Sequence, residues 1–117
     1  MRLGVLKEPE GERRVSIVPN SVKKLLNLGF EVNVERAAGS LAHHDDSEYE
    51  EAGASMSEHS LAISADIVVS ISMPNVTTMA DGQMLACIVD PFRHPSRIKD
   101  AVDAGITLFG MDMIPRR

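Results

Sequence analysis

The sequence has one cysteine, few aromatic residues and no long apolar run. Because Cys87 is the single cysteine among 117 residues, no disulfide can form within the chain. Together with seven methionines, this usage is typical of a cytoplasmic protein. Aromatic residues make up 3% of the chain, too few for recognition of single-stranded nucleic acid by stacking. No apolar run approaches the ~20 residues of a membrane-spanning helix, and the first residues lack a signal-peptide pattern.

Basic residues are absent from the middle of the chain. No Lys or Arg occurs from Ala37 to Phe92, whereas nine Asp and Glu residues do, and the formal net charge is -5. Such an acidic surface repels a polyanion, so nucleic acid is a poor partner.

Closely spaced glycines are also missing. None of the eight glycines has another glycine two residues away, so neither a Gly-x-Gly-x-x-Gly turn nor a P-loop is present. Both motifs let the backbone approach a phosphate closely. The chain therefore lacks a standard phosphate-binding loop for NAD or ATP.

The residues that are present alternate between short apolar runs and amphipathic segments. Strands are predicted over residues 3–6, 30–34, 67–71, 85–89 and 106–110, with a weak one near 54–56. Helices are predicted over residues 20–28, capped by Asn20 or Ser21, and over residues 47–52, capped by Ser47. A third, short helix is predicted to end at about residue 63, and a fourth runs from Pro95 or Ser96 to residue 104.

Strands separated by helices predict βαβ units and a mainly parallel sheet. We therefore expect one domain over residues 1–117, an α/β three-layer sandwich of about five strands, Rossmann-like or flavodoxin-like, without a dinucleotide fingerprint. A domain of this class usually continues with a docked helix after its last strand, so the end of the sequence favours a truncated domain.

Arg13 and Arg14 follow the first predicted strand. An arginine at the carboxyl edge of a sheet can hold a carboxylate or phosphate through two parallel hydrogen bonds. The alternatives are a solvated loop charge or a local ion pair with Glu10 or Glu12.

Other polar residues give weaker signals. His43, His44, Asp45 and Asp46 are adjacent, and adjacent side chains diverge, so a solvated loop is favoured over a metal site. His59 and His94 are isolated, and Cys87 is expected to be an inert core thiol. Asp90 follows a strand end, where a general base could lie, although a loop or capping role is favoured.

The opening block from Arg2 to Val15 is distinctive, and further segments recur in the order of one family. These segments are Val18–Pro19, Val22–Leu25, Leu28–Glu35, Ala38–Gly39, Tyr49–Ala54 and Ala65–Val69. The chain resembles, over essentially its whole length, the N-terminal domain of alanine dehydrogenase and of the alpha subunit of proton-translocating NAD(P) transhydrogenase.

Three positions bear on which branch the chain resembles. Alanine dehydrogenases have a substrate-binding lysine two residues before the proline after the fourth strand, and Ser72 stands there. Their catalytic histidine after the next strand corresponds to Asp90. A lysine common to both branches corresponds to Ser70. The chain lacks both the first lysine and the histidine, which argues against pyruvate amination. In this respect it resembles the transhydrogenase branch.

The end of the chain is similar to the start of an Arg-Gln-Asp loop in transhydrogenases. The resemblance implies that Arg116 contacts the nicotinamide end of NAD(H), whereas Arg117 replaces a usually apolar residue. Arg14 matches an arginine that binds substrate in the dehydrogenase branch, which makes it a candidate cleft residue.

The resemblance implies that the parent enzyme transfers hydride between NAD(H) and NADP(H), coupled to proton translocation. Its implied partners are an NAD(H)-binding second domain, NADP(H)-binding and membrane subunits, and a second copy in a homodimer. We expect a cytoplasmic protein peripheral to the inner membrane. The 117 residues alone are expected to be inactive, with no metal and no tightly bound NAD. The alternatives are a domain of an alanine or saccharopine dehydrogenase-like enzyme and a stand-alone binding module.

Overall fold

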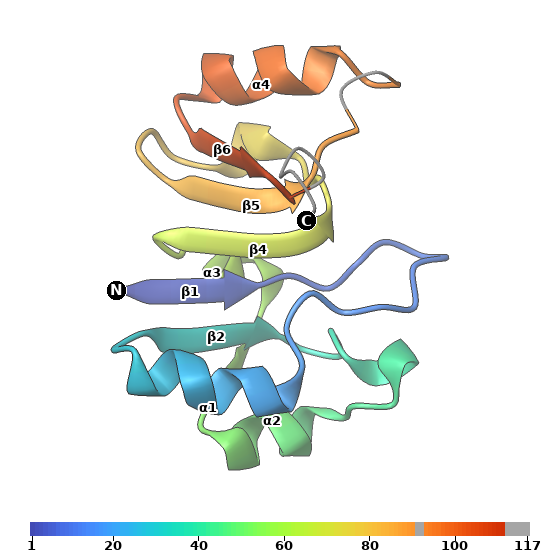
Figure 1. The fold of residues 1–117 in the computed structure, drawn as a ribbon, viewed down its shortest axis with the longest axis vertical. Helices are drawn as coiled ribbons and strands as arrows, with labels where there is room; N and C mark the ends of the chain where they lie inside the picture. Colours follow the sequence, from blue (N-terminus) through green and yellow to red (C-terminus); the bar gives the residue numbers. More distant parts are fainter. Residues whose placement is uncertain (91–92, 112–117) are drawn as a thin grey trace, which may run out of the picture.

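Six parallel strands form a single sheet in the order β3-β2-β1-β4-β5-β6 (Figure 1). The structure is a computed structural model that describes residues 1–90 and 93–111. The strands are β1 (Arg2–Val5), β2 (Glu31–Glu35), β3 (Ser55–Ser57), β4 (Ile67–Ser72), β5 (Met84–Ile88) and β6 (Thr107–Gly110). This confirms the parallel α/β fold. The prediction of about five strands is one too low, because β3 is three residues long and two of them are serines.

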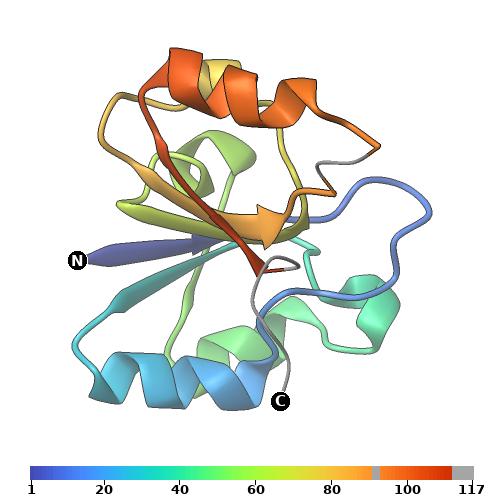
Figure 2. The same ribbon diagram turned by 45° about the horizontal axis from the view of Figure 1, so that its top comes forward.

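The helices lie on both faces of the sheet, as the right-handed βαβ rule requires. They are α1 (Pro19–Asn27), α2 (Asp46–Ala52), α3 (His59–Ala62) and α4 (Ser96–Ala104), with 3-10 turns η1 (Ser40–Ala42) and η2 (Val76–Thr78). Figure 2 shows α1 and α2 on one side and α4 on the other. Within the described ranges, every helix is too short or too polar to cross a bilayer.

Each face of the sheet has its own apolar core. On the α1 and α2 side, Val5, Val34 and Tyr49 are fully buried. On the α3 and α4 side, Leu85 and Cys87 are fully buried, which confirms Cys87 as a core residue. Helices therefore pack on both faces of the sheet, as the predicted three-layer fold requires.

Two helix starts differ from the predictions. α1 begins at Pro19, so Asn20 and Ser21 lie inside the first turn rather than at the cap. Proline is well suited to the first helical position because the N–H it lacks has no partner there in any helix. Asp45, not Ser47, caps α2, and its carboxylate accepts a backbone N–H of the first turn. All three predicted caps are polar residues that lie one or two positions after Pro19 or Asp45.

Candidate functional site

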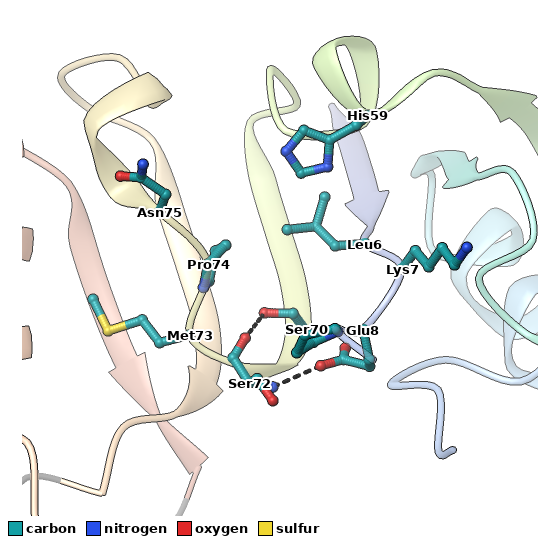
Figure 3. Close-up of a pocket in the computed structure, with 10 residues that line it drawn as sticks. Leu6, Lys7, Glu8, His59, Ser70, Ser72, Met73, Pro74 and Asn75 are labelled. Carbon is teal, nitrogen blue, oxygen red and sulfur yellow. Dashed lines mark hydrogen bonds between the residues drawn. The ribbon is translucent and has the colours of Figure 1, made fainter. Parts of the chain in front are cut away.

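The sheet order reverses between β1 and β4, and the loops that leave these two strands diverge there. Ligands of open α/β sheets bind in the crevice that this divergence creates at the carboxyl ends of the strands. The structure has a cavity of about 380 Å³ at this point (Figure 3). Its walls come from the loop after β1, the end of β4 and the start of α3, and are formed by Leu6, Lys7, Glu8, Pro9, His59, Ser70, Ser72, Met73, Pro74 and Asn75.

Glu8 forms part of the cavity floor. Its side chain is buried, and its two carboxylate oxygens accept the backbone N–H groups of Ile71 and Ser72, both at 2.8 Å. A buried carboxylate is costly unless such donors compensate for lost water. Glu8 therefore ties the loop after β1 to the end of β4 and fixes the shape of the crevice.

The two serines at the positions compared with lysines above have different surroundings. Ser70 is 2% exposed, and its hydroxyl donates to the carbonyl of Ser72 at 2.6 Å. The Ser72 backbone N–H is held by Glu8, as described above. Two short neutral side chains therefore stand where the resemblance implies long cations.

His59 lines the cavity from the first residue of α3. Its Nδ1 forms a hydrogen bond with the carboxylate of Glu35, at the end of β2. Figure 3 shows the imidazole on the opposite side of the cavity from Glu8. Sequence reasoning treated His59 as isolated, because Glu35 lies 24 residues earlier in the chain.

A second hollow of about 210 Å³ lies between the ends of β4 and β5. Arg14 and Asp90, two of the residues predicted from the sequence, both line it, together with Glu12, Ile71, Ser72, Ile88, His94 and Arg97. Arg14 and Asp90 therefore lie at the same carboxyl edge of the sheet, while their roles in binding or catalysis stay predictions.

Arg14 forms the local ion pair that sequence analysis kept open as an alternative. Its Nε and Nη2 donate to the two carboxylate oxygens of Glu12, each at 3.0 Å. The Arg14 guanidinium and backbone N–H lower the pKa of Glu12 to about 2. The arginine therefore faces the hollow with two of its donors already bound.

Asp90 lies in the connection from β5 to α4, two residues after the last residue of β5. Its φ is +51°, in the left-handed region that aspartate tolerates better than most residues. Its carbonyl accepts the N–H of His94 at 3.0 Å, and its carboxylate lies 3.9 Å from Nε of Arg93. These contacts give Asp90 the loop role favoured from the sequence, while a role as general base stays a prediction.

The acidic and histidine residues between β2 and α2 hold local structure. Asp45 caps α2, Asp46 accepts the backbone N–H of Ala37 at 2.9 Å, and His44 contacts Glu48. Residues 1–90 and 93–111 contain no group of three His, Cys, Asp or Glu side chains that could hold a metal ion. Arg116 and Arg117, which carry further sequence predictions, lie outside the described residues.

Comparison with known proteins decides the family. The sequence model of the family described as "Alanine dehydrogenase/PNT, N-terminal domain" matches residues 4–117. The chain belongs to this family. The membership predicted from the opening block and the recurring segments is therefore confirmed.

Within the alanine dehydrogenase/PNT N-terminal domain family, similarity to transhydrogenases is broader than similarity to alanine dehydrogenase. The NAD(P) transhydrogenase subunit alpha of Haemophilus influenzae is 32% identical over 99% of this chain and 23% of its own length. The crystal structure of transhydrogenase from Sinorhizobium meliloti superposes with a TM-score of 0.95 at 34% identity, over 100% of this chain and 36% of that one. An L-alanine dehydrogenase structure gives a TM-score of 0.87 at 29% identity, covering 94% of this chain and 32% of that one. The chain thus spans about a quarter to a third of each relative.

The observed site of this family member does not fit a dinucleotide diphosphate. Such a group needs backbone N–H donors at a short glycine turn between the first strand and its helix. Here the connection runs from residue 6 to residue 18, and α1 begins with Pro19, which has no N–H. The Glu8 carboxylate lies in this connection and already accepts hydrogen bonds from two backbone N–H groups of β4. The described residues therefore place a negative charge where a diphosphate would need donors.

Sequence reasoning missed Glu8 and His59 as site residues. The signal for Glu8 was available, since a charged residue three positions after a buried strand lies at the carboxyl edge of the sheet. Its partners Ile71 and Ser72 lie 63 and 64 residues away, so their contact could not be read locally.

Proposed function

We propose that this chain is the first domain of an NAD(P) transhydrogenase alpha subunit. Its parent would transfer hydride between NAD(H) and NADP(H), coupled to proton translocation. The observation that carries the proposal is the match to transhydrogenases over 99–100% of the chain at 32–34% identity. Ser72 and Asp90, which replace the lysine and histidine of the dehydrogenase branch, support it.

In this proposal NAD(H) is held mainly by a second domain of the same subunit, and the carboxyl edge of this chain faces it. The misfit between Glu8 and a diphosphate supports this division of labour. The nicotinamide supplies the hydride when bound. The role of this chain is to orient the nicotinamide end and to exclude water, with the Arg14 hollow on the facing wall and Arg116 as the contact to the nicotinamide end that the resemblance implies.

The proposal also extends to the assembly. Hydride transfer to NADP(H) needs a second nucleotide-binding subunit, and coupling to protons needs a membrane subunit. The chain would then lie on the cytoplasmic side, peripheral to the inner membrane. A homodimer of the alpha subunit is a further element of the proposal.

The first experiment is to sequence the parent gene beyond the codon for Arg117. A frame that continues into a Gln and Asp loop and then a Gly-x-Gly-x-x-Gly turn supports the proposal. A stop codon at that point overturns it and favours a stand-alone binding module.

A kinetic test then uses the parent enzyme with its partner subunits. Arg14→Ala and Arg116→Ala are expected to weaken NADH binding or slow hydride transfer to NADP+ without unfolding. Arg13→Ala is the matched control, since it removes the same charge from the neighbouring exposed residue. Unchanged kinetics in both test variants would contradict the roles proposed for these arginines.

The second candidate is an alanine dehydrogenase-like enzyme, favoured by the TM-score of 0.87 to an L-alanine dehydrogenase structure. The replacement of its lysine by Ser72 speaks against it. Oxidation of NADH that depends on pyruvate and ammonium, rather than on NADP+, would decide for this candidate.

A further inference from the structure

Glu8 is a buried carboxylate without a paired cation among the described residues. It is 7% exposed, and its two oxygens accept the backbone N–H groups of Ile71 and Ser72. An ionised carboxylate offers about four acceptor positions, so about two remain after these bonds. In the part of the chain that the structure describes, no Lys, Arg or His side chain forms an ion pair with Glu8. Since buried charges are ordinarily matched by an opposite charge, Glu8 has both an unmatched charge and unused acceptor positions.

The cationic side chains around the cavity are directed elsewhere. Lys7 is exposed, and Figure 3 shows its ammonium group turned away from Glu8. Arg14 interacts with Glu8 electrostatically, but its guanidinium is bound to both carboxylate oxygens of Glu12. His59 lies on the opposite side of the cavity from Glu8. These residues therefore leave the cavity side of Glu8 without a neutralising contact.

The space beside Glu8 suits a small ligand with an apolar body. The cavity holds about 380 Å³, and Leu6 and Met73 are among the apolar residues of its wall. Ser70 lines the same space, and its hydroxyl proton is already donated to the carbonyl of Ser72. The Ser70 oxygen can therefore accept a hydrogen bond but not donate a second one. Acceptors on the floor and apolar groups on the wall together fit a hydrogen-bond donor that carries a short hydrocarbon.

A primary ammonium group is the cation that matches this combination. Its positive charge complements Glu8, and its N–H groups can donate to carboxylate and hydroxyl oxygens. A guanidinium binds two free oxygens side by side, whereas both Glu8 oxygens already accept an N–H. Residues 1–90 and 93–111 contain no group of three side chains that could hold a metal ion. Ser70 stands where the resemblance implies a lysine, so the chain does not supply an ammonium from this position itself.

We propose that this cavity, which we name the Glu8 cavity, binds a small free primary amine in its ammonium form. The ammonium group donates to Glu8 and Ser70, and the hydrocarbon part contacts Leu6 and Met73. The Glu8 cavity is a different space from the hollow that Arg14 lines. The proposal therefore goes beyond the proposed function and does not depend on hydride transfer.

Titration calorimetry on the whole gene product tests the proposal, with n-propylammonium chloride as the probe. We expect saturable binding with a Kd in about the millimolar range, as for other ligands of so few atoms. Tetramethylammonium carries the same charge without an N–H donor, and K⁺ is a bare cation. Both are expected to bind at least ~tenfold more weakly. Absence of saturable n-propylammonium binding, or equal affinity for the three cations, overturns the proposal.

Glu8→Gln tests whether the amine binds at the buried carboxylate. This variant removes the negative charge and is expected to weaken n-propylammonium binding at least ~tenfold. Glu10→Gln is the matched control, because it removes the same charge from an exposed residue of the same loop and should leave the affinity unchanged. Unchanged affinity in Glu8→Gln, or an equal loss in the two variants, overturns the proposal.

Ser70→Lys keeps the test available if Glu8→Gln does not fold. A lysine at this position places its own ammonium group in the Glu8 cavity and should abolish binding of the probe. Ser60→Lys, which adds the same charge at an exposed position of α3, should bind n-propylammonium as the unmodified protein does. Full affinity in Ser70→Lys overturns the proposal.

Discussion

The two halves of the sheet follow the same β–α alternation but are covered differently. β1 and β2 have α1 and α2 on one face and α3 on the other. β5 and β6 have α4 on one face and, among the described residues, an exposed apolar strip on the other. The difference follows from connection handedness, because right-handed crossovers that proceed in opposite directions from β1 place their helices on opposite faces. Strand order, rather than hydrophobicity, decides which surface stays uncovered.

The largest effect is expected in the centre of the covered half. Tyr49 is 0% exposed, and its hydroxyl donates to the carbonyl of Ile17 at 2.8 Å. Tyr49→Ala should lower the free energy of unfolding by about 4 kcal/mol, since it leaves a large cavity. Tyr49→Phe keeps the ring and should cost about 1 kcal/mol for the lost hydrogen bond. Urea unfolding of the 117-residue chain measures both, and equal losses would show that the ring does not anchor this half.

Gly4→Ala tests the contact of α3 with the central strand. A methyl group on Gly4 would lie 1.9 Å from the backbone oxygen of Ala62, so α3 would have to move. We expect a loss of about 3 kcal/mol. Gly82→Ala is the control, since its methyl would meet no described atom within 4 Å and only backbone strain at φ +90° remains, about 1 kcal/mol. A smaller loss at Gly4 than at Gly82 would contradict the tight packing of α3.

Glu8 joins the two halves, and its removal should loosen the crevice between them. Glu8→Ala leaves two buried N–H groups without their acceptor and should cost about 2 kcal/mol. Glu8→Gln retains one acceptor oxygen and should cost roughly half as much. Amide hydrogen exchange at Ile71 and Ser72 is expected to accelerate in the same order. Unchanged exchange in the alanine variant would refute the link.

Alkaline pH should weaken the covered half selectively. Burial, assisted by the nearby charges of Glu48 and Asp46, raises the pKa of Tyr49 from 10.0 to about 12. Between these values the unfolded chain has lost the phenolic proton that the folded chain retains, so stability falls as pH rises from 10 towards 12. Because Tyr49 is the single tyrosine, tyrosinate absorbance reports it directly. Tyr49→Phe should remove this pH dependence, and an identical profile in both proteins would disprove the assignment.

The smallest effect is expected on the exposed apolar strip of β5 and β6, which includes Met84 and Phe109. Met84→Ser should change the stability of the 117-residue chain by no more than about 0.5 kcal/mol. Its neighbour Leu85, on the packed face of the same strand, should lose about 3 kcal/mol in Leu85→Ala. Comparable losses by urea unfolding would show that the Met84 side of β5 is covered within these 117 residues.

The strands were predictable where their signal is local. Residues 85–89 are a continuous apolar run, residues 67–71 are apolar except for Ser70, and strands occupy nearly the same positions. β3 was hard to predict because it depends on pairing of Ser55–Ser57 with β2 rather than on its own composition. The cap predictions for α1 and α2 were wrong for a related reason. Several polar residues near each helix start could act as the N-cap, and tertiary packing determines where each helix begins.

The candidate site was predictable in part. That Arg14 and Asp90 face one hollow follows from their places after parallel strands. The partners of Glu8 and His59 could not be inferred, because each contact joins segments brought together by the strand order. The exposed strip of β5 and β6 could not be predicted either, because Met84 and Leu85 are both apolar neighbours in the sequence and differ in which face of the sheet they occupy.

The central position of β1 also constrains how the protein is made. Leu3 pairs with Val32 on one side and with Ile67 on the other. A ribosome therefore releases β1 first, and β2 and β3 can join it while the opposite edge of β1 still lacks its neighbour. Until β4 emerges, that edge can pair with another nascent chain. The time needed to translate residues 58–72 therefore contributes to how long this edge of a newly made copy is exposed to aggregation.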